Sequence, residues 1–213
     1  NFFILVGNNP ESHLYVNLKE RAAREVGIAF QKYIFDEKTT EQEILTQIRI
    51  LNHDPKVNAI LIQLHLPSHL NQYKIIAAMD PQKDVDGFHP DNIAKFARDA
   101  HAHTPVLVSA IQALIHATAV NIRGKHAVIL ANSMVFANPV ALYLSRADVE
   151  TDIFAPMTDN IPPEVVRADI LITALGRPHC ITKKHIKDGA IIIDVGLTKQ
   201  HDDILMGDVD RFD

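Results

Sequence analysis

The side chains best able to take up or release protons are crowded into residues 80–92, which read Asp-Pro-Gln-Lys-Asp-Val-Asp-Gly-Phe-His-Pro-Asp-Asn. Burying that many charges is too costly unless each is paired, so this stretch is expected outside the core. Pro81, Gly87 and Pro90 interrupt any helix or strand period and therefore predict a shaped loop. A solvated linker fits the same composition equally well, because charged loops are common.

Three further polar candidates precede this loop. Tyr15 and Lys19 are four residues apart on an expected helix, so both project from one face. Taken alone, they are more often a packing aromatic and a solvated lysine. Short-chain dehydrogenases use a Tyr-x-x-x-Lys pair in hydride chemistry, but their glycine-rich nucleotide turn precedes the pair, and here that order is reversed. Gln63 is the polar exception near the carboxyl end of the apolar segment 57–64, where a satisfied strand-end amide is the commoner role.

Strand-length apolar runs alternate with amphipathic helical segments along the chain. Strands are expected at residues 2–6, 28–34, 57–64, 125–130, 149–154, 169–174 and 190–195. The first helix is expected from an N-cap at Ser12 to about residue 26, and Thr-Thr-Glu-Gln-Glu at residues 39–43 opens the second. Such alternation predicts the α/β class, with two doubly wound parallel-sheet domains, the second Rossmann-like, and a cleft between them.

The domains are expected at residues 1–106 and 107–213, with a linking helix at about 107–121. The first is interpreted as a folate-binding catalytic domain and the second as a dinucleotide-binding domain, on the resemblance described below. In parallel sheets, ligands bind beyond the carboxyl ends of the strands. Gln63 and the 80–92 loop are therefore expected at that edge of the first domain.

Composition limits the functional classes. The 213 residues are 47% hydrophobic and 22% charged, which is ordinary for a globular protein, and the net charge of −5 favours neither a nucleic-acid nor a membrane partner. No apolar run approaches the roughly 20 residues that span a bilayer. The single Cys180 favours a reducing compartment, and without a recognisable signal peptide we expect a cytoplasmic protein. The twelve histidines show no metal-binding spacing tied to a carboxylate, so no metal is expected.

Over nearly its whole length the chain resembles the bifunctional methylenetetrahydrofolate dehydrogenase/cyclohydrolase family. The most specific match is the ten-residue pattern at 81–90, followed by Asn92. The other matching segments occur in the family's order: residues 5–7 with Ser12, Tyr15, Val16 and Lys19; 63–67; 104–105; 124–128; 168–172 with Gly176 and Pro178; 186–190; 193–196; and 207–210.

The resemblance implies one-carbon metabolism: NADP-dependent oxidation of 5,10-methylenetetrahydrofolate to 5,10-methenyltetrahydrofolate, and hydrolysis of that product to 10-formyltetrahydrofolate. It implies that Lys19, Tyr15 and Gln63 are catalytic, and that Tyr15, Gln63 and Asp86 bind the substrate, Asp86 as the pterin anchor. A partly desolvated lysine beside a cationic carbon has a lowered pKa and can act as a base near neutrality. A homodimer through the second domain is also implied.

The resemblance places the cofactor at Ala131, Asn132, Ser133, Pro139 and Gly176. The family expects Gly-Arg-Ser where this chain has Ala-Asn-Ser, and its arginine would pair with the 2′-phosphate of NADP. Asn132 cannot supply that charge, so weakened NADP binding is expected and NAD is the alternative cofactor.

Three hypotheses remain open. The first is a bifunctional enzyme that uses NADP or NAD. The second is a cyclohydrolase or folate-binding protein with a degenerate dinucleotide site. The third is a paralogue that acts through its dimer surface without catalysis, and the intact folate-side residues argue against it.

Overall fold

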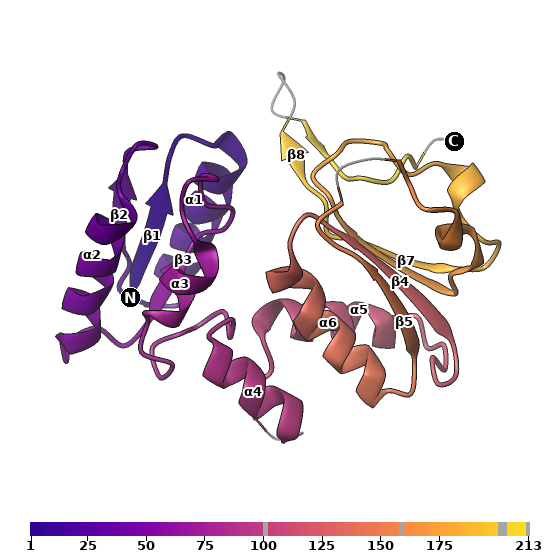
Figure 1. The fold of residues 1–213 in the computed structure, drawn as a ribbon, viewed down its shortest axis with the longest axis horizontal. Helices are drawn as coiled ribbons and strands as arrows, with labels where there is room; N and C mark the ends of the chain where they lie inside the picture. Colours follow the sequence, from indigo (N-terminus) through magenta and orange to yellow (C-terminus); the bar gives the residue numbers. More distant parts are fainter. Residues whose placement is uncertain (100–101, 158–159, 200–203, 212–213) are drawn as a thin grey trace. The chain divides into compact units, whose positions relative to one another are not determined.

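The computed structural model describes residues 1–99, 102–157, 160–199 and 204–211, and the chain divides into two compact units, residues 1–106 and 107–213 (Figure 1). Both units are built on parallel sheets with connecting helices, so the predicted α/β class is confirmed. Within the described ranges, no helix is both long and apolar enough to cross a membrane.

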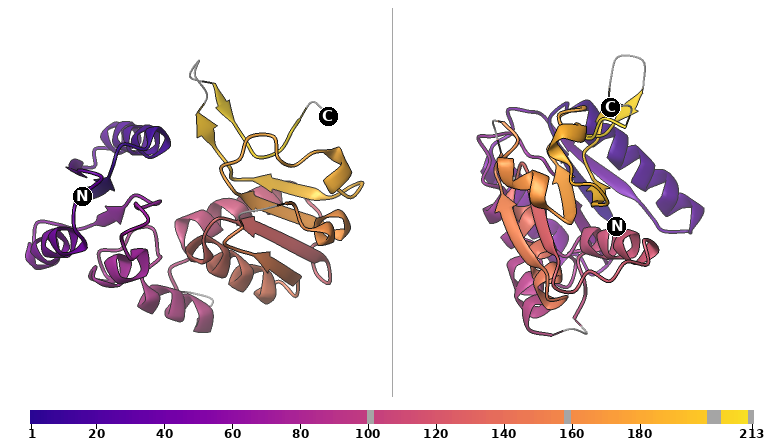
Figure 2. Two further views of the ribbon diagram at one scale, coloured as in Figure 1. Left: turned by 45° about the horizontal axis from the view of Figure 1, so that its top comes forward. Right: turned by 90° about the vertical axis from the view of Figure 1, so that its right-hand side faces the viewer.

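The first unit contains a three-stranded parallel sheet in the order β2-β1-β3. Its elements are β1 (Phe2–Val6), α1 (Pro10–Glu25), β2 (Gln31–Phe35), α2 (Glu41–His53), β3 (Ile60–Ile62), α3 (Gln72–Ala77) and α4 (Pro90–Arg98). The chain moves outward from β1 to β2 and then returns past β1 to β3. Because such crossovers are right-handed, the two moves place α1 and α2 on opposite faces of the sheet (Figure 2).

The prediction of an N-cap at Ser12 is wrong. Helix α1 begins at Pro10, and the Asn9 side chain accepts a hydrogen bond from the backbone N–H of Ser12 at 2.8 Å. Asn is a strong N-cap and Pro is well suited to the first helical turn, so Asn9-Pro10 was the better local signal. Helix α2 begins within the predicted segment 39–43, and there Thr40 and Glu43 are bonded reciprocally in a capping box.

The second unit contains a four-stranded parallel sheet in the order β5-β4-β6-β7 and a separate antiparallel hairpin, β8-β9. Its elements are α5 (Val106–Ala117), β4 (His126–Ala131), α6 (Met134–Arg146), β5 (Glu150–Phe154), η1 (Pro163–Arg167), β6 (Ile170–Ala174), η2 (Lys183–His185), β7 (Ile191–Asp194), β8 (Thr198–Lys199) and β9 (Leu205–Met206). Helix α5 ends at Ala117, short of the predicted residue 121.

Side chains from both faces of the second sheet are buried. Val128 and Leu130 pack with Leu171, Val165 of η1 and Ile181 on one face. The intervening residues of β4 point the other way, and all are fully buried. A sheet covered on both faces explains why its central strands, β4 and β6, read as nearly continuous apolar runs rather than as alternating patterns.

Candidate active site

Lys19 and Gln63 are joined by a direct hydrogen bond in the first unit. The Lys19 amine donates to Gln63 Oε1 at 3.1 Å, and the Gln63 amide donates in turn to the carbonyl of Leu64 at 2.7 Å. Gln63 is only 8% exposed and directly follows β3. The direction in which successive strands are added to the sheet reverses between β1 and β3. Open parallel sheets bind ligands at the carboxyl edge beside such a switch point. Two predicted residues, 44 positions apart, thus meet where a ligand is expected.

Lys19 and Asp86 have pKa values shifted toward neutrality. Burial lowers the pKa of the Lys19 amine below its usual 10.5, and the negative charge of Asp86 opposes that shift. Burial raises the pKa of the Asp86 carboxyl, Lys19 opposes that shift, and the charge of Asp84 adds to it. Groups whose pKa values are moved in this way by burial and a specific partner are typical of general acid–base sites.

Tyr15 lies one turn before Lys19 on α1 and is half-buried. Burial, and then the charge of Glu11, raise the pKa of its hydroxyl. The phenol therefore stays protonated at neutral pH, where it can donate a hydrogen bond. With Lys19, Gln63 and Asp86, this unit combines an amine, an amide, a carboxyl and a phenol, which together can transfer protons and hold a polar ligand.

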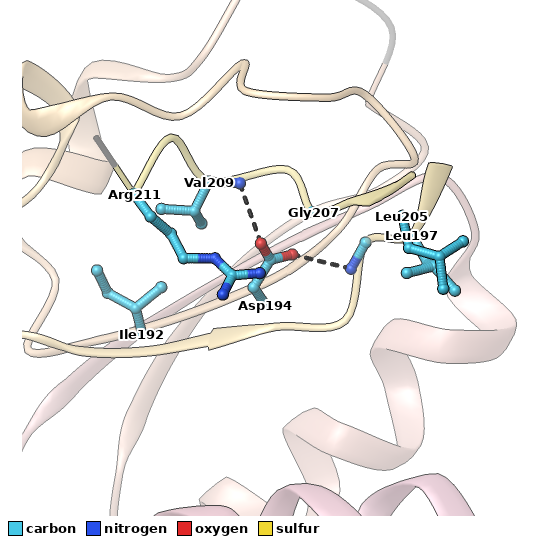
Figure 3. A pocket seen from close by; sticks show the side chains of 8 residues that line it. Ile192, Asp194, Leu197, Leu205, Gly207, Val209 and Arg211 are labelled. Carbon is cyan, nitrogen blue, oxygen red and sulfur yellow. Dashed lines mark hydrogen bonds between the residues drawn. The ribbon is translucent and has the colours of Figure 1, made fainter. Parts of the chain in front are cut away.

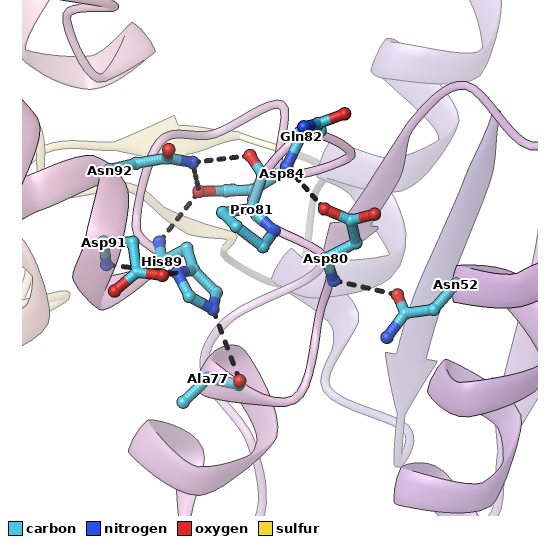
Figure 4. A network of polar contacts seen from close by, with 9 residues as sticks. All are labelled: Asn52, Ala77, Asp80, Pro81, Gln82, Asp84, His89, Asp91 and Asn92. Carbon is cyan, nitrogen blue, oxygen red and sulfur yellow. Dashed lines mark hydrogen bonds and ion pairs between the residues drawn. The ribbon is translucent and has the colours of Figure 1, made fainter.

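The 80–92 loop is organised around the buried Asp84, which is 7% exposed (Figure 4). Its two carboxylate oxygens accept hydrogen bonds from the backbone N–H groups of Gly87 and His89, at 3.0 and 2.8 Å, and from the Asn92 amide at 2.9 Å. Asp84 precedes Asp86 and the three donors follow it, so these hydrogen bonds fix the backbone on which Asp86 is carried. The loop is therefore a structured wall of the candidate site, held by hydrogen bonds to a buried carboxylate, rather than a solvated linker.

Lys83 holds the other side of this loop. From the sequence, Lys83 and Asp84 are expected to shape the loop by pairing within it, and for Lys83 this expectation is wrong. Its amine donates to the carbonyls of Leu51, Asn52 and Asp54, at 2.9, 2.7 and 2.9 Å, at the end of α2. Carbonyls at a helix C-terminus lack partners within the helix and favour a cation. Lys83 thus ties the loop to α2.

Gly87 allows the loop to approach the segment before α5. Its φ is +79°, and a Cβ there would lie 2.9 Å from the Cα of Pro105. The backbone N–H of Val106 also donates to the carbonyl of Asp86 at 3.2 Å. A side chain at position 87 is therefore excluded both by backbone conformation and by space.

The second unit has its own switch point, between β4 and β6. Asn132 and Ser133 follow β4 there, and Gly176 follows β6; the Asn132 N–H donates to the carbonyl of Ala174 at 3.3 Å. Ser133 is the N-cap of α6, a 13-residue helix whose amino end starts at this edge. A helix N-terminus at a switch point suits the pyrophosphate of a dinucleotide.

Two other predicted cofactor residues can offer little side-chain contact at this edge. Ala131 is fully buried, and Pro139 is buried inside α6. By contrast, Gly176 is exposed with φ +65°, and no atom lies within 4 Å of where a Cβ would stand. Backbone at Gly176 can therefore be approached closely by a ligand.

The same edge fits the 2′-phosphate of NADP less well than it fits a dinucleotide in general. Among the residues that follow β4 and β5, 131–135 and 154–157, none is basic. A 2′-phosphate is normally held by an arginine at this position. In the part of the chain that the structure describes, no cluster of three or more His, Cys, Asp or Glu residues could hold a metal ion.

Two family models match the chain. The one described as "Tetrahydrofolate dehydrogenase/cyclohydrolase, catalytic domain" matches residues 2–86, and "Tetrahydrofolate dehydrogenase/cyclohydrolase, NAD(P)-binding domain" matches residues 104–213. The chain belongs to this family. Its second unit is thus the NAD(P)-binding domain of the tetrahydrofolate dehydrogenase/cyclohydrolase family, and the predicted resemblance is confirmed.

Individual relatives agree across nearly the whole chain. The protein called "Bifunctional protein FolD" from Brevibacillus brevis is 40% identical over 210 residues, which cover 99% of this chain and 74% of the relative. The solved FolD dehydrogenase/cyclohydrolase from Campylobacter jejuni is 34% identical with a TM-score of 0.83, covering 98% of this chain and 74% of that one. A Trypanosoma brucei enzyme, solved with NADP and an inhibitor, is 28% identical with a TM-score of 0.84, covering 98% and 73%. These likenesses confirm the predicted two-domain fold.

The structure adds one residue that the sequence interpretation had not singled out, Asp208, and it shows which partners two residues of the 80–92 loop use. Asp84 and Lys83 shape the wall that carries Asp86, and Asp208 braces the loop around Gly176. The crowding of charges at 80–92 pointed to the first two. Asp208 lies 31 and 33 residues beyond the two amides that it binds, Arg177 and Leu175, so no local pattern indicated its role.

Proposed function

We propose that this chain oxidises 5,10-methylenetetrahydrofolate with NADP and hydrolyses the resulting 5,10-methenyltetrahydrofolate to 10-formyltetrahydrofolate. The observation that carries the proposal is the hydrogen bond between the Lys19 amine and Gln63 Oε1. The Asp86 carboxyl interacts electrostatically with the same amine, and each group affects the pKa of the other. This is an acid–base site at the ligand-binding edge of a domain from a folate-processing family.

In the proposed hydrolysis, the neutral Lys19 amine takes a proton from water as the water oxygen attacks the cationic methenyl carbon. Lys19 then gives that proton to the ring nitrogen when its bond to the carbon breaks. The hydroxyl on that carbon releases its own proton to solvent and becomes the formyl C=O, so the cation and one water give the neutral product and one proton. Burial favours the neutral amine, and Gln63 fixes its position by accepting one of its N–H groups. Tyr15, on the same helix face as Lys19, is proposed to donate a hydrogen bond to the substrate from its protonated hydroxyl.

Asp86 is proposed to anchor the substrate. An ionised carboxylate accepts charge-assisted hydrogen bonds from the two N–H groups along an amino-pyrimidine edge. Asp84 and Lys83 hold the backbone around Asp86, so the carboxyl is positioned before the substrate arrives. Gln63 and Tyr15 are proposed to contact the substrate as well.

The bound NADP supplies the hydride acceptor for the oxidation. In the second unit, the amino end of α6 after Ser133 and the open backbone at Gly176 are proposed to hold its pyrophosphate. Asn132 and the buried Ala131 and Pro139 shape this edge through their backbone or packing. NAD is the alternative cofactor.

Hydrolysis of methenyltetrahydrofolate in the absence of any dinucleotide tests the second half of this proposal, the hydrolysis. The expected result is a rate well above the spontaneous one, because the residues proposed for this step all lie in the first unit. Tetrahydrofolate binding without hydrolysis would support a folate-binding protein instead. Absence of both would favour the third hypothesis, in which the chain acts through an interaction surface.

Replacing Asn132 with arginine is expected to increase the affinity for NADP about tenfold and to leave the affinity for NAD unchanged. The reason is that a guanidinium at this edge can pair with the 2′-phosphate, which meets no basic side chain among residues 131–135 and 154–157. Calorimetric titration of both dinucleotides into the unmodified chain and the variant measures the change. Asn132→Gln, which adds length without charge, is the matched control.

An equal gain for NADP and NAD, or tight NADP binding by the unmodified chain that depends on the 2′-phosphate, would contradict this account of the edge.

A homodimer through the second domain is proposed as the assembly. Strand β5 is an edge strand of the second sheet, and its Ile153 is 36% exposed. Edge strands present unpaired backbone groups that can pair with another chain. Light scattering on the full chain is expected to give twice the mass of the monomer, and Ile153→Lys is expected to shift it toward the monomer.

The cytoplasm is the proposed compartment. The one cysteine, Cys180, is a free and partly buried thiol. Its pKa is raised, chiefly because the thiol is buried. An unreactive thiol and a net charge of −5 suit a reducing compartment and a small-molecule substrate.

A further inference from the structure

Asp208 is a fully buried carboxylate at the carboxyl edge of the second sheet. It is 0% exposed and accepts three hydrogen bonds: from the Thr173 hydroxyl and the Leu175 N–H at 2.7 Å each, and from the Arg177 N–H at 2.8 Å. A buried carboxylate is tolerated only when its oxygens are satisfied in this way. The two backbone donors fix the loop that follows β6.

Those two donors flank Gly176 directly. The Leu175 N–H bonds Oδ2 of Asp208 and the Arg177 N–H bonds Oδ1, so one carboxylate bridges both sides of the glycine. Gly176 has φ +65° and open space around it. The Asp208 carboxylate is therefore what keeps this exposed loop in one conformation at the switch point.

A second carboxylate holds Asp208 in place. Asp194, at the end of β7, accepts hydrogen bonds from the backbone N–H groups of Val209 and Gly196, at 3.0 Å each (Figure 3). It also accepts one from the backbone N–H of Asp208 at 3.1 Å. Asp194 is also one of the residues that line a cavity of about 520 Å³. The segment that carries Asp208 is thereby tied to the same sheet edge.

Two glycines leave the space that these carboxylates occupy. A Cβ at Gly196 would stand 2.1 Å from Cγ of Asp208, and one at Gly207 would stand 2.0 Å from Oδ2 of Asp194. Any side chain at either position would displace a carboxylate. The absence of a side chain at Gly196 and Gly207 is therefore required for Asp208 and Asp194 to keep their positions.

We propose that Asp208 is a positioning residue for dinucleotide binding, acting through the Leu175–Arg177 loop on which Gly176 lies. This inference rests on the proposed function, because it takes that loop to be part of the dinucleotide site. Asp208 itself is buried and bonded to backbone, so it acts by keeping the loop in its binding conformation before the ligand arrives. A loop that must be ordered on binding lowers the affinity.

Asp208→Asn is expected to weaken dinucleotide binding about tenfold, since small losses of positioning carry effects of this order or more. Asparagine has one acceptor oxygen, so its NH₂ group must face either the Arg177 N–H or the Leu175 N–H, donor against donor. Calorimetric titration of NADP and NAD into the full chain, at a temperature well below its unfolding transition, measures the loss directly. Methenyltetrahydrofolate hydrolysis without dinucleotide is expected to stay unchanged.

Asp169→Asn is the matched control. Asp169 lies just before β6, at the opposite end of the strand, where it accepts the His126 N–H at 3.0 Å and pairs with Lys187. Both variants are expected to lower the unfolding temperature, but only Asp208→Asn is expected to lose dinucleotide affinity. A purely structural role for Asp208 predicts the same result for both.

Hydrogen exchange on the unmodified chain needs no variant and covers the case in which Asp208→Asn does not fold. The amides of Leu175 and Arg177 are expected to exchange as slowly as those inside β6, and rapid exchange at either would overturn the proposal. Unweakened dinucleotide binding by Asp208→Asn would also overturn it, while leaving the proposed function standing. If the unmodified chain binds neither NADP nor NAD, the dehydrogenase half of the proposed function fails, and the role of Asp208 fails with it.

Discussion

Lys19→Met is expected to reduce methenyltetrahydrofolate hydrolysis by roughly 10²–10⁴-fold, the usual contribution of a general acid or base. The variant removes the amine that Gln63 holds at 3.1 Å but keeps an unbranched side chain that can fill the same half-buried space. Burial of the ammonium is unfavourable, as the lowered pKa of Lys19 indicates, so the fold should lose little stability. The decay of methenyltetrahydrofolate absorbance measures the rate.

Two further variants isolate the chemistry of the amine. Lys32→Met removes a lysine of the same unit that pairs with Glu20 away from the site, and it should hydrolyse at the normal rate. Lys19→Arg keeps a positive charge but cannot release a proton near neutrality, so it should be as inactive as Lys19→Met. Undiminished hydrolysis by Lys19→Met would remove Lys19 from the mechanism.

Asp86→Ala is expected to raise KM for the folate substrate by about 10- to 100-fold, which corresponds to losing one or two hydrogen bonds to a charged group. Its effect on the fold should be small, because burying the ionised Asp86 carboxyl is unfavourable in the free protein. The pKa of that carboxyl is raised by burial, which shows that the ionised form is disfavoured there. Steady-state kinetics at several folate concentrations separates KM from kcat.

Asp86→Asn provides a pH-dependent readout of the same site. The negative charge of Asp86 raises the pKa of Lys19 against the larger effect of burial. Removing that charge makes the ammonium form less favourable, so the pKa of Lys19 falls further, and the rise of rate with pH moves to lower pH. Asp91→Asn changes an exposed carboxylate at the start of α4 and should move neither KM nor the pH profile. A shift to higher pH in Asp86→Asn would contradict the proposed coupling.

The parts of the site that could be predicted from sequence are those set by local spacing. Tyr15 and Lys19 share a helix face because they are four residues apart, and Gln63 interrupts an apolar strand segment at its carboxyl end. The parallel alternation of strands and helices then brings strand ends to one edge. These rules act over a few residues, and a single chain displays them directly.

The contacts that escaped prediction join residues that are distant in sequence. Lys83 reaches carbonyls at the end of α2, 29 to 32 residues earlier, and Asp208 reaches amides 31 and 33 residues earlier. Nothing about a lysine beside an aspartate in sequence tells which partner it selects in three dimensions. The ends of elements were also displaced where a stronger cap or a shorter ladder decided them, as at Asn9 and at β3, which spans only Ile60–Ile62.

The central claim, that the chain is a working dehydrogenase and cyclohydrolase, is tested most directly by incubating the full chain with 5,10-methylenetetrahydrofolate and NADP, NAD or neither. The predicted result is that reduced dinucleotide and 10-formyltetrahydrofolate accumulate together with NADP, and that neither forms without a dinucleotide. Formation of no reduced dinucleotide with either cofactor would contradict the claim. If supplied methenyltetrahydrofolate were still hydrolysed, that outcome would leave a cyclohydrolase with a degenerate dinucleotide site.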